Sequence, residues 1–171
     1  EDGEEVYGHD TSPTERDTDG DELEDGVEVN NCIYGENNDK CTNPTLKDSD
    51  EDGLEDGDEV DNYETNPMSK DSDEDGLDDD VEVNNCLYGE SNNECTDPNK
   101  KDSDTDGLDD GDELDADTGY NQITDPMNRD SDGGGQIDGL EIEVDDTDPN
   151  DPSDDNLSAF DDDGDGLTNG E

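Results

Sequence analysis

The sequence predicts a mostly irregular fold: an extended array of repeats with a few short helical turns and little or no sheet. Hydrophobic residues make up 20% of the 171 residues and the formal net charge is −55, so an ordinary apolar core is not expected. One acidic motif nevertheless recurs along the whole chain. The linkers between its copies also share a pattern, which random disorder would not preserve.

The motif is D-x-D-x-D-G-L-x-D-x-x-E. It occupies residues 48–59, 71–82 and 102–113, with variants at 17–28 and 130–141 and a sixth copy, one residue short, at 161–171. The first six residues, EDGEEV, match the back half of the motif. We number the motif positions 1 to 12 and name each loop by its residue range.

The spacing of the motifs predicts the domain organisation. Successive motifs start 31, 23, 31, 28 and 31 residues apart, so long and short linkers alternate. We therefore divide the chain into 1–16, a half repeat with a linker; 17–70 and 71–129, two double repeats with cysteine-containing linkers; and 130–171, divergent repeats with an incomplete last site. Each linker carries T-x-P, whose proline favours a rigid turn that aims one loop at the next.

The first half of the motif brings carboxylates together. Asp48, Asp50 and Asp52 alternate along the chain, and a tight turn would point all three toward one centre. Gly53 permits the sharp backbone turn that this arrangement needs.

The second half of the motif completes an oxygen-only site. Asp56 supplies a further carboxylate, Glu59 is able to bind through both oxygens, and the carbonyl of Leu54 adds another ligand. Six to eight flexible oxygen ligands are what Ca²⁺ prefers, whereas Mg²⁺ requires a smaller octahedron and softer metals favour Cys or His. We expect about six or more Ca²⁺ ions, and a calcium-stabilised array.

Some carboxylates exceed the needs of one ion per loop. Glu51, Glu55 and Asp58 are spare in loop 48–59. They would form a solvated acidic face or hold second ions between neighbouring loops, and we would look for such ions first at Asp58 and Asp112.

The motif resembles the thrombospondin type 3 repeat in its prokaryotic form, with DGL, Glu at position 12 and T-x-P linkers. An EF-hand or dockerin loop has its apolar residue at position 8, whereas here Leu stands at position 7. The resemblance implies an extracellular, calcium-wrapped array that serves as a spacer or stalk in surface proteins. By match, the metal ligands would be Asp2, Glu5, Asp17, Asp19, Asp21, Leu23, Asp25, Glu28, Asp48, Asp50, Asp52, Leu54, Asp56, Glu59, Asp71, Asp73, Asp75, Leu77, Asp79, Glu82, Asp102, Asp104, Asp106, Leu108, Asp110, Glu113, Asp130, Asp132, Gln136, Asp138, Glu141, Asp161, Asp163, Asp165, Leu167 and Asn169.

Three loops depart from the pattern. Glu22 replaces the turn glycine, Gly134 removes the carboxylate of position 5, and Asn169 stands at position 9 of a loop without position 12. These three sites are expected to be weaker or differently built.

The four cysteines lie in two matched C-x₈-C segments. Four cysteines allow three connectivities, and the identical contexts favour Cys32–Cys41 and Cys86–Cys95. A zinc site is the rival, but no His lies nearby and C-x₂-C spacing is absent. Disulfides indicate an oxidising, extracellular setting.

The charge and the motifs also exclude classes of function. Nucleic acid binding requires Lys and Arg, and no apolar run could span a membrane. We see no nucleophile–base pair and no carboxylate beside apolar sequence that would raise its pKa, so we expect no enzyme.

We predict an extracellular or cell-surface structural protein, a stalk, spacer or fibre segment rigidified by Ca²⁺. The alternatives are a calcium-dependent adhesion or ligand-binding module, with residues 136–160 as its candidate segment, and an acidic ion store or mineral template. The half motifs at both ends predict either a longer surface protein or head-to-tail copies of the chain in a filament.

Overall fold

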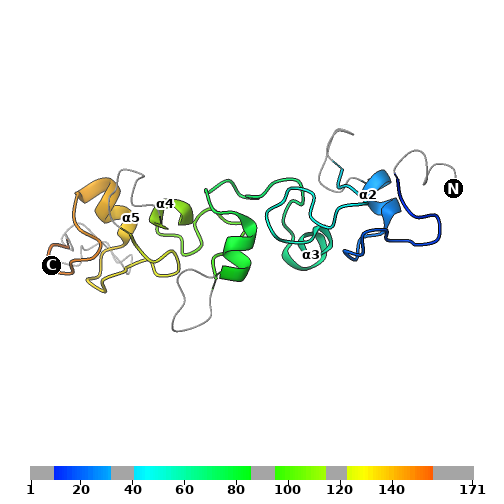
Figure 1. The fold of residues 1–171 in the computed structure, drawn as a ribbon. Coiled ribbons are helices and arrows are strands. Elements are labelled where there is room, and N and C mark those ends of the chain that lie inside the picture. The colour runs from blue at the N-terminus through cyan, green and yellow to red at the C-terminus, as the bar shows by residue number, and fades with distance from the viewer. Residues whose placement is uncertain (1–9, 32–40, 86–94, 115–122, 156–171) are drawn as a thin grey trace, which may run out of the picture.

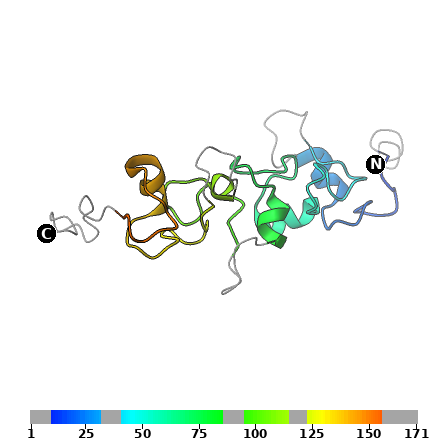
Figure 2. The ribbon, with the colours of Figure 1, turned by 60° about the vertical axis from the view of Figure 1, so that its left-hand side comes forward.

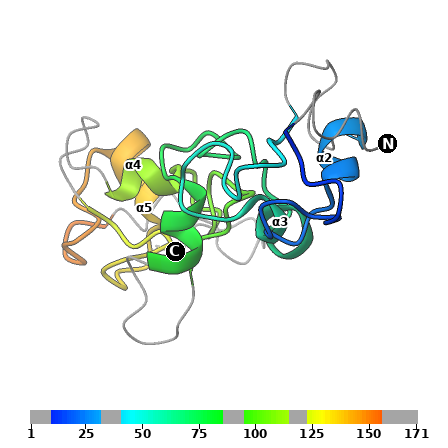
Figure 3. The same cartoon turned by 45° about the vertical axis from the view of Figure 1, so that its right-hand side comes forward.

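The computed structural model describes residues 10–31, 41–85, 95–114 and 123–155. These parts are mostly irregular, with short helices and no strand among the described residues, as the fold class expected from the sequence requires. The helices follow one another along an elongated molecule in chain order, with α2 and α5 toward opposite ends (Figure 1, Figure 2). Figure 3 shows α2 and α3 together on one side and α4 and α5 on the other.

The helical elements are short, and two α-helical turns continue directly into π-helical turns. They are α2 (Asp25–Asn31), α3 (Asp56–Asp58), η1 (Glu59–Tyr63), η2 (Val81–Asn85), α4 (Asp110–Leu114), α5 (Asp138–Leu140) and η3 (Glu141–Asp145). No helix among the described residues has the length and apolar character that crossing a membrane requires.

Each of the four α-helices among the described residues begins inside a motif, at position 9. The backbone N–H of that residue closes the loop by donating to the carbonyl oxygen of the residue before position 1, as Asp56 does to Lys47 at 2.7 Å and Asp110 to Lys101 at 2.6 Å. The first helical turn then carries positions 9 to 12, so the loop and the helix are one unit.

The aspartate at position 1 shapes the turn. In loop 48–59, Asp48 Oδ1 accepts the N–H of Glu51 at 2.6 Å and Oδ2 accepts that of Gly53 at 3.1 Å. Both donors have positive φ, 64° and 119°. The same pair of bonds is made by Asp17, Asp71, Asp102 and Asp130 in their own loops. This aspartate therefore acts as a backbone cap, with both oxygens engaged.

Each helical turn packs against the loop that precedes it. A Cβ added at Gly57 would lie 2.0 Å from the carbonyl oxygen of Asp21, and one at Gly111 would lie 2.3 Å from that of Asp75. At the next junction, Gly139 donates its N–H to Asp106 Oδ2 at 3.1 Å. At Gly57, Gly111 and Gly139, position 10 is therefore a backbone-to-backbone contact that leaves no room for a side chain. Loop 71–82 has Asp80 at this position, and a Cβ added at Gly26 of loop 17–28 would meet no described atom within 4 Å.

The interior is made of carboxylates. Among the described residues, the buried apolar side chains are Leu23, Leu54 and Leu108 and the linker prolines Pro44, Pro67, Pro126 and Pro149. In the same part of the chain twelve aspartates and glutamates are buried, and they are Asp21, Glu28, Asp56, Glu59, Asp75, Asp79, Glu82, Asp106, Asp110, Glu113, Asp138 and Glu141. Hydrophobic burial cannot be the main source of stability in such an interior.

Replacing Gly111 with alanine should separate loop 102–113 from loop 71–82, because the new Cβ would meet the carbonyl oxygen of Asp75. We expect a loss of about 1–3 kcal/mol in the free energy of unfolding, measured by urea denaturation in calcium-containing buffer. Gly26, at the same position of loop 17–28, is the matched control, because no described atom lies within 4 Å of its added Cβ. Gly26→Ala should instead stabilise its helix by roughly 1 kcal/mol, and equal effects of the two changes would contradict the packing.

Candidate metal centres

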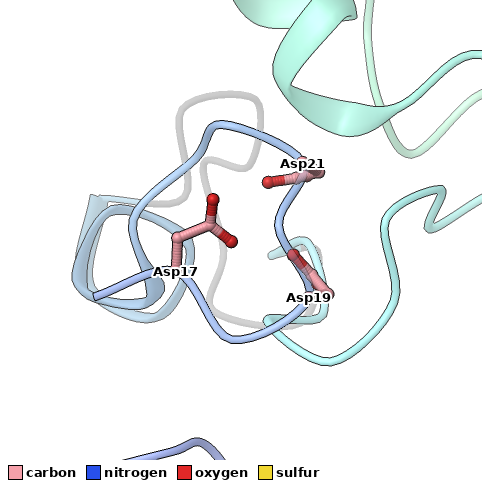
Figure 4. Close-up of side chains that lie close together, drawn as sticks. All are labelled: Asp17, Asp19 and Asp21. Atoms are coloured by element: carbon pink, nitrogen blue, oxygen red, sulfur yellow. The ribbon is translucent and has the colours of Figure 1, made fainter. Parts of the chain in front are cut away.

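The first kind of candidate site lies within one loop. The carboxylates of Asp17, Asp19 and Asp21 point toward one another across the turn (Figure 4). One oxygen from each lies within 4.8 Å of the others. The triads Asp48, Asp50, Asp52 and Asp71, Asp73, Asp75 form equivalent groups. The structure therefore brings together the three alternating aspartates, as the motif predicts.

In loops 48–59 and 71–82, hydrogen bonding leaves one oxygen of positions 3 and 5 free for another ligand, whereas both oxygens of Asp106 in loop 102–113 accept backbone N–H groups. Asp50 Oδ1 accepts the N–H of Asp52 at 3.1 Å, and Asp52 Oδ1 accepts that of Leu54 at 2.7 Å. The Oδ2 atoms of Asp50 and Asp52 are buried and accept no hydrogen bond within the described part of the chain. Asp73 and Asp75 are engaged in the same way. A cation bound between these oxygens would give each of them a partner.

The second kind of site lies between neighbouring loops. Asp52 and Glu59 of one loop form a group with Asp79 of the next, and Asp21 and Glu28 form the same group with Asp56. Glu59 and Asp79 are fully buried. Glu59 Oε2 has no hydrogen-bond donor among the described residues. This arrangement combines positions 5 and 12 of one loop with position 9 of the following loop.

Position 9 thus has a different role from the one expected. The motif assigned Asp56 to the ion of its own loop. In the structure, its carboxylate binds Ser49 of that loop, accepting the N–H at 2.7 Å and the Oγ–H at 2.6 Å. It also faces the preceding loop, because the helix that starts at Asp56 packs there. A linear motif cannot show which loop a side chain will face.

The shared groups are also not where we would have looked for second ions. Asp58 is exposed and accepts a hydrogen bond from Asn62 Nδ2 at 2.8 Å. The groups at the loop junctions are instead built from motif positions that we had assigned to one ion per loop.

The T-x-P threonine positions the glutamate of position 12, a role that sequence reasoning missed. Thr65 donates its N–H to the Glu59 carbonyl at 3.1 Å and its hydroxyl to Glu59 Oε1 at 3.2 Å. Thr124 makes the same two bonds to Glu113, at 3.2 and 2.9 Å. The recurrence of Thr two residues before each proline was the available signal.

The small hydroxyl residue at position 2 is a second missed feature. Ser49 Oγ donates to Asp56 and also accepts the N–H of Asn43, at 2.9 Å. The Ser49 hydroxyl therefore connects the linker turn to the buried carboxylate of Asp56 by two hydrogen bonds. Thr18, Ser72 and Ser131 make equivalent bonds.

Basic residues join loops without neutralising the buried oxygens. Lys70 Nζ donates to the carbonyl oxygen of Glu51, and Lys101 Nζ donates to that of Glu74. Each lysine stands just before one loop and reaches position 4 of the preceding loop. Both of these bonds end on backbone carbonyls, so the carboxylate groups still need positive charge from elsewhere.

Burial raises the pKa of these carboxyl groups, contrary to our expectation. Desolvation, and then the charges of Asp50 and Asp52, raise the pKa of Glu59 to about 9. Desolvation likewise raises the pKa of Glu113 to about 9 and, with help from the charges of Asp106 and Asp102, that of Asp104 to about 7. We expected ordinary pKa values because the carboxylates have few apolar neighbours in the sequence. Their burial comes instead from packing between loops, which the sequence does not show.

The remaining predicted ligands fall into two classes. Leu23, Leu54 and Leu108 at position 7 are buried, Leu77 is half-buried, and Gln136 at the same position of loop 130–141 is also buried. Outside the described residues lie Asp2, Glu5, Asp161, Asp163, Asp165, Leu167 and Asn169.

The cysteines are described in part. Cys41 and Cys95 are not free thiols. Their predicted partners, Cys32 and Cys86, lie outside the described residues, so the pairing stays a prediction.

Comparisons with known proteins identify no family. No family model matches the chain, and no curated protein matches it. Two solved structures are similar to part of it, a biofilm-associated protein B domain at 36% identity and a biofilm-associated protein BSP domain at 37%. The matches cover 31% and 30% of this chain and only 11% and 7% of those chains, with TM-scores of 0.26 and 0.25. At these TM-scores the similarity does not establish a shared fold.

The stability of the ion-free fold should decrease as pH rises. Because the pKa of Glu59 is about 9 when folded and near 4.5 when unfolded, the folded chain holds a proton that the unfolded chain releases. The stabilisation is therefore complete below about pH 4.5 and is lost as pH rises toward about 9. In EDTA, circular dichroism should therefore detect a thermal unfolding transition at pH 5 and little or no folded structure at pH 8.

Calcium binding at pH 5, where the ion-free chain keeps its fold and its protons, should release the same protons. Calorimetry in buffers of different ionisation enthalpy measures this release. A binding heat independent of the buffer would contradict the protonated, ion-free state.

Glu22→Gly should strengthen loop 17–28. Glu22 has φ of 81°, where a side chain is strained and glycine is not. We expect the free energy of unfolding of the calcium-loaded chain to rise by about 1 kcal/mol. Glu143, exposed within the helical η3, is the control, and Glu143→Gly should lower stability. If the free energy of unfolding of Glu22→Gly does not rise, the positive φ at this position does not strain the loop.

Proposed function

We propose that this chain is an extracellular structural segment that binds several Ca²⁺ ions, serving as the stalk, spacer or fibre portion of a surface protein. The observation that carries the proposal is the fully buried Glu59, whose Oε2 accepts no hydrogen bond from the described residues and lies in a group with Asp52 and Asp79. Buried carboxylates without a counter-charge are strongly destabilising. A bound cation, or protonation, must compensate them.

The donor set favours calcium. The groups are built from carboxylate oxygens of flexible aspartates and glutamates, with no histidine or cysteine in the groups described. Several negative oxygens and no soft ligand fit Ca²⁺ better than Zn²⁺ or copper. Mg²⁺ would keep its waters and require a tighter octahedron, which the spread of three carboxylates from two loops fits less well.

Two kinds of ion would have different mechanical effects. An ion within Asp48, Asp50 and Asp52 would hold one turn closed. An ion between Asp52, Glu59 and Asp79 would join two loops and fix their relative orientation. At a free Ca²⁺ concentration tenfold above its dissociation constant, each site would add about 1.4 kcal/mol. The sum over many sites would replace the hydrophobic core that the chain lacks.

A structural role follows from this arrangement. The elongated order of the helices in Figure 1 is maintained by contacts between successive loops, and the proposed ions lie at those contacts. Such a segment would be stiff where calcium is abundant and soft where it is absent. The resemblance of the motif to thrombospondin type 3 repeats remains part of the proposal.

At pH 8, where the buried carboxyl groups cannot be stabilised by protons, removal of calcium should convert the chain from an ordered, elongated molecule to an expanded coil. Small-angle scattering and circular dichroism in EDTA should show a larger radius of gyration and the loss of helical signal, because the carboxylates then repel one another. Restoring Ca²⁺ should reverse both changes, and Mg²⁺ at equal ionic strength should restore much less. Profiles that are identical with and without EDTA would refute the proposed function.

A further inference from the structure

Loop 130–141 lacks one carboxylate of its own but keeps the rest of the turn. Asp130 accepts the N–H groups of Gly133 and Gly135, at 2.8 and 3.0 Å, as position 1 does in every described loop. Asp132 Oδ1 accepts the N–H of Gly134 at 2.8 Å. Position 5 is Gly134, so the within-loop triad of the other loops cannot form from the motif alone.

Asp155 makes the contact that the missing carboxylate would make. Its Oδ2 accepts the N–H of Gln136, at position 7, at 3.1 Å. In loop 48–59 that bond is made by position 5, from Leu54 to Asp52 at 2.7 Å. The other oxygen of Asp155, Oδ1, is buried and accepts no hydrogen bond from the described residues, as is true of Asp52 Oδ2. A residue 21 positions further along the chain thus reproduces both features of position 5.

The glycine and the distant aspartate depend on each other. A Cβ added at Gly134 would lie 2.1 Å from Asp155 Oδ2 and 2.6 Å from Oδ1. Any side chain at position 134 would therefore displace this carboxylate. The departure of the motif at Gly134 makes the space into which Asp155 folds back.

An independent observation indicates that a cation belongs here. Glu141, at position 12, is fully buried, and within the described parts of the chain its carboxylate oxygens accept no hydrogen bond of ordinary geometry. The Thr147 hydroxyl lies near enough only to reduce slightly the rise that burial causes in its pKa. The nearby charges that act on it most strongly are those of Asp155 and Asp132. Asp132 Oδ2 is also buried without a donor among these residues. Several unpartnered oxygens around one buried glutamate require positive charge.

We propose that Asp155 is a ligand of a Ca²⁺ ion in loop 130–141, where it replaces the position 5 carboxylate and ties the following segment back onto the loop. This inference rests on the proposed function, because it assumes that the loops bind calcium. It assigns a ligand that lies outside every copy of the motif. It also predicts that loop 130–141 binds an ion with the affinity of a complete loop and is not impaired by Gly134.

A tryptophan placed beside this loop allows its ion to be observed alone. The chain contains no tryptophan, and Val144 in η3 is 67% exposed, so Val144→Trp adds a local donor without filling the interior. Terbium, a luminescent probe for calcium sites, is titrated with selective excitation of the indole, and Ca²⁺ is then added as competitor. All variants are made in this background in the full chain.

Asp155→Asn should weaken terbium and Ca²⁺ binding at this site by about tenfold or more, because one charged ligand is lost. Asp146→Asn is the matched control, since Asp146 is exposed and the chemical change is the same. It should leave the affinity unchanged.

The double variant Gly134→Asp with Asp155→Ala tests the assignment by rescue. It removes the carboxylate of Asp155 and returns a carboxylate to position 5. Its affinity for terbium and Ca²⁺ should therefore lie within about fivefold of that of the parent. Weakening by Asp155→Asn without this rescue would overturn the inference, because Asp155 would then support the fold without acting as the missing carboxylate.

The outcomes also separate this inference from the proposed function. If Asp155→Asn and Asp146→Asn both keep the parent's affinity for terbium and Ca²⁺, and calorimetry shows Ca²⁺ binding to the parent, Asp155 is not a ligand and the proposed function stands. A parent that binds Ca²⁺ but gives no indole-sensitised terbium signal would also refute only the inference. A parent that binds no Ca²⁺ would refute both.

Discussion

Repulsion among buried carboxylates is the constraint on which the rest of this structure depends. Glu59, Asp79 and Asp56 are fully buried, and the described part of the chain provides only three buried leucines and four buried prolines to offset them. Desolvation and neighbouring charges raise the pKa of Glu59 to about 9, so its charged form is strongly disfavoured as long as no cation is present. The fold is therefore conditional: its interior requires protons or metal ions. Most domains instead bury apolar surface and pair the few charges that they enclose.

Each of these carboxylates has two roles: it accepts hydrogen bonds that shape its own loop, and it contributes to the group that would hold an ion. Asp52 uses Oδ1 to accept the N–H of Leu54 and leaves Oδ2 free toward the shared group. Asp56 holds Ser49 within its own loop and faces the preceding loop at the same time. Each loop is thus connected to its neighbour through side chains that also define its own turn. This coupling explains why glycine is needed at positions 57 and 111, where the backbones of successive loops meet.

Much of this arrangement could be predicted from the sequence, because the motif is local. The alternation of Asp48, Asp50 and Asp52 and the turn at Gly53 lie within six residues, and their geometry follows from the backbone. The resemblance to thrombospondin type 3 repeats implied few helices and little sheet, and the composition implied only that an ordinary apolar core would be absent. What could not be predicted depends on contacts between loops: the grouping of Asp79 with Asp52, the burial that raises the pKa values, and the role of Asp155. Thr65 and Ser49 were visible in the pattern, but hydroxyl residues in turns are common, and only the structure shows which carboxylates they hold.

The most direct test of the account is to locate the ions. A crystal structure of the calcium-loaded chain, with anomalous scattering to identify the metal, should show one peak among Asp48, Asp50 and Asp52 and another among Asp52, Glu59 and Asp79. The carboxylates should remain buried around both peaks. Carboxylates that turn outward to solvent, with no anomalous peak at either group, would contradict the claim that cations hold this interior together.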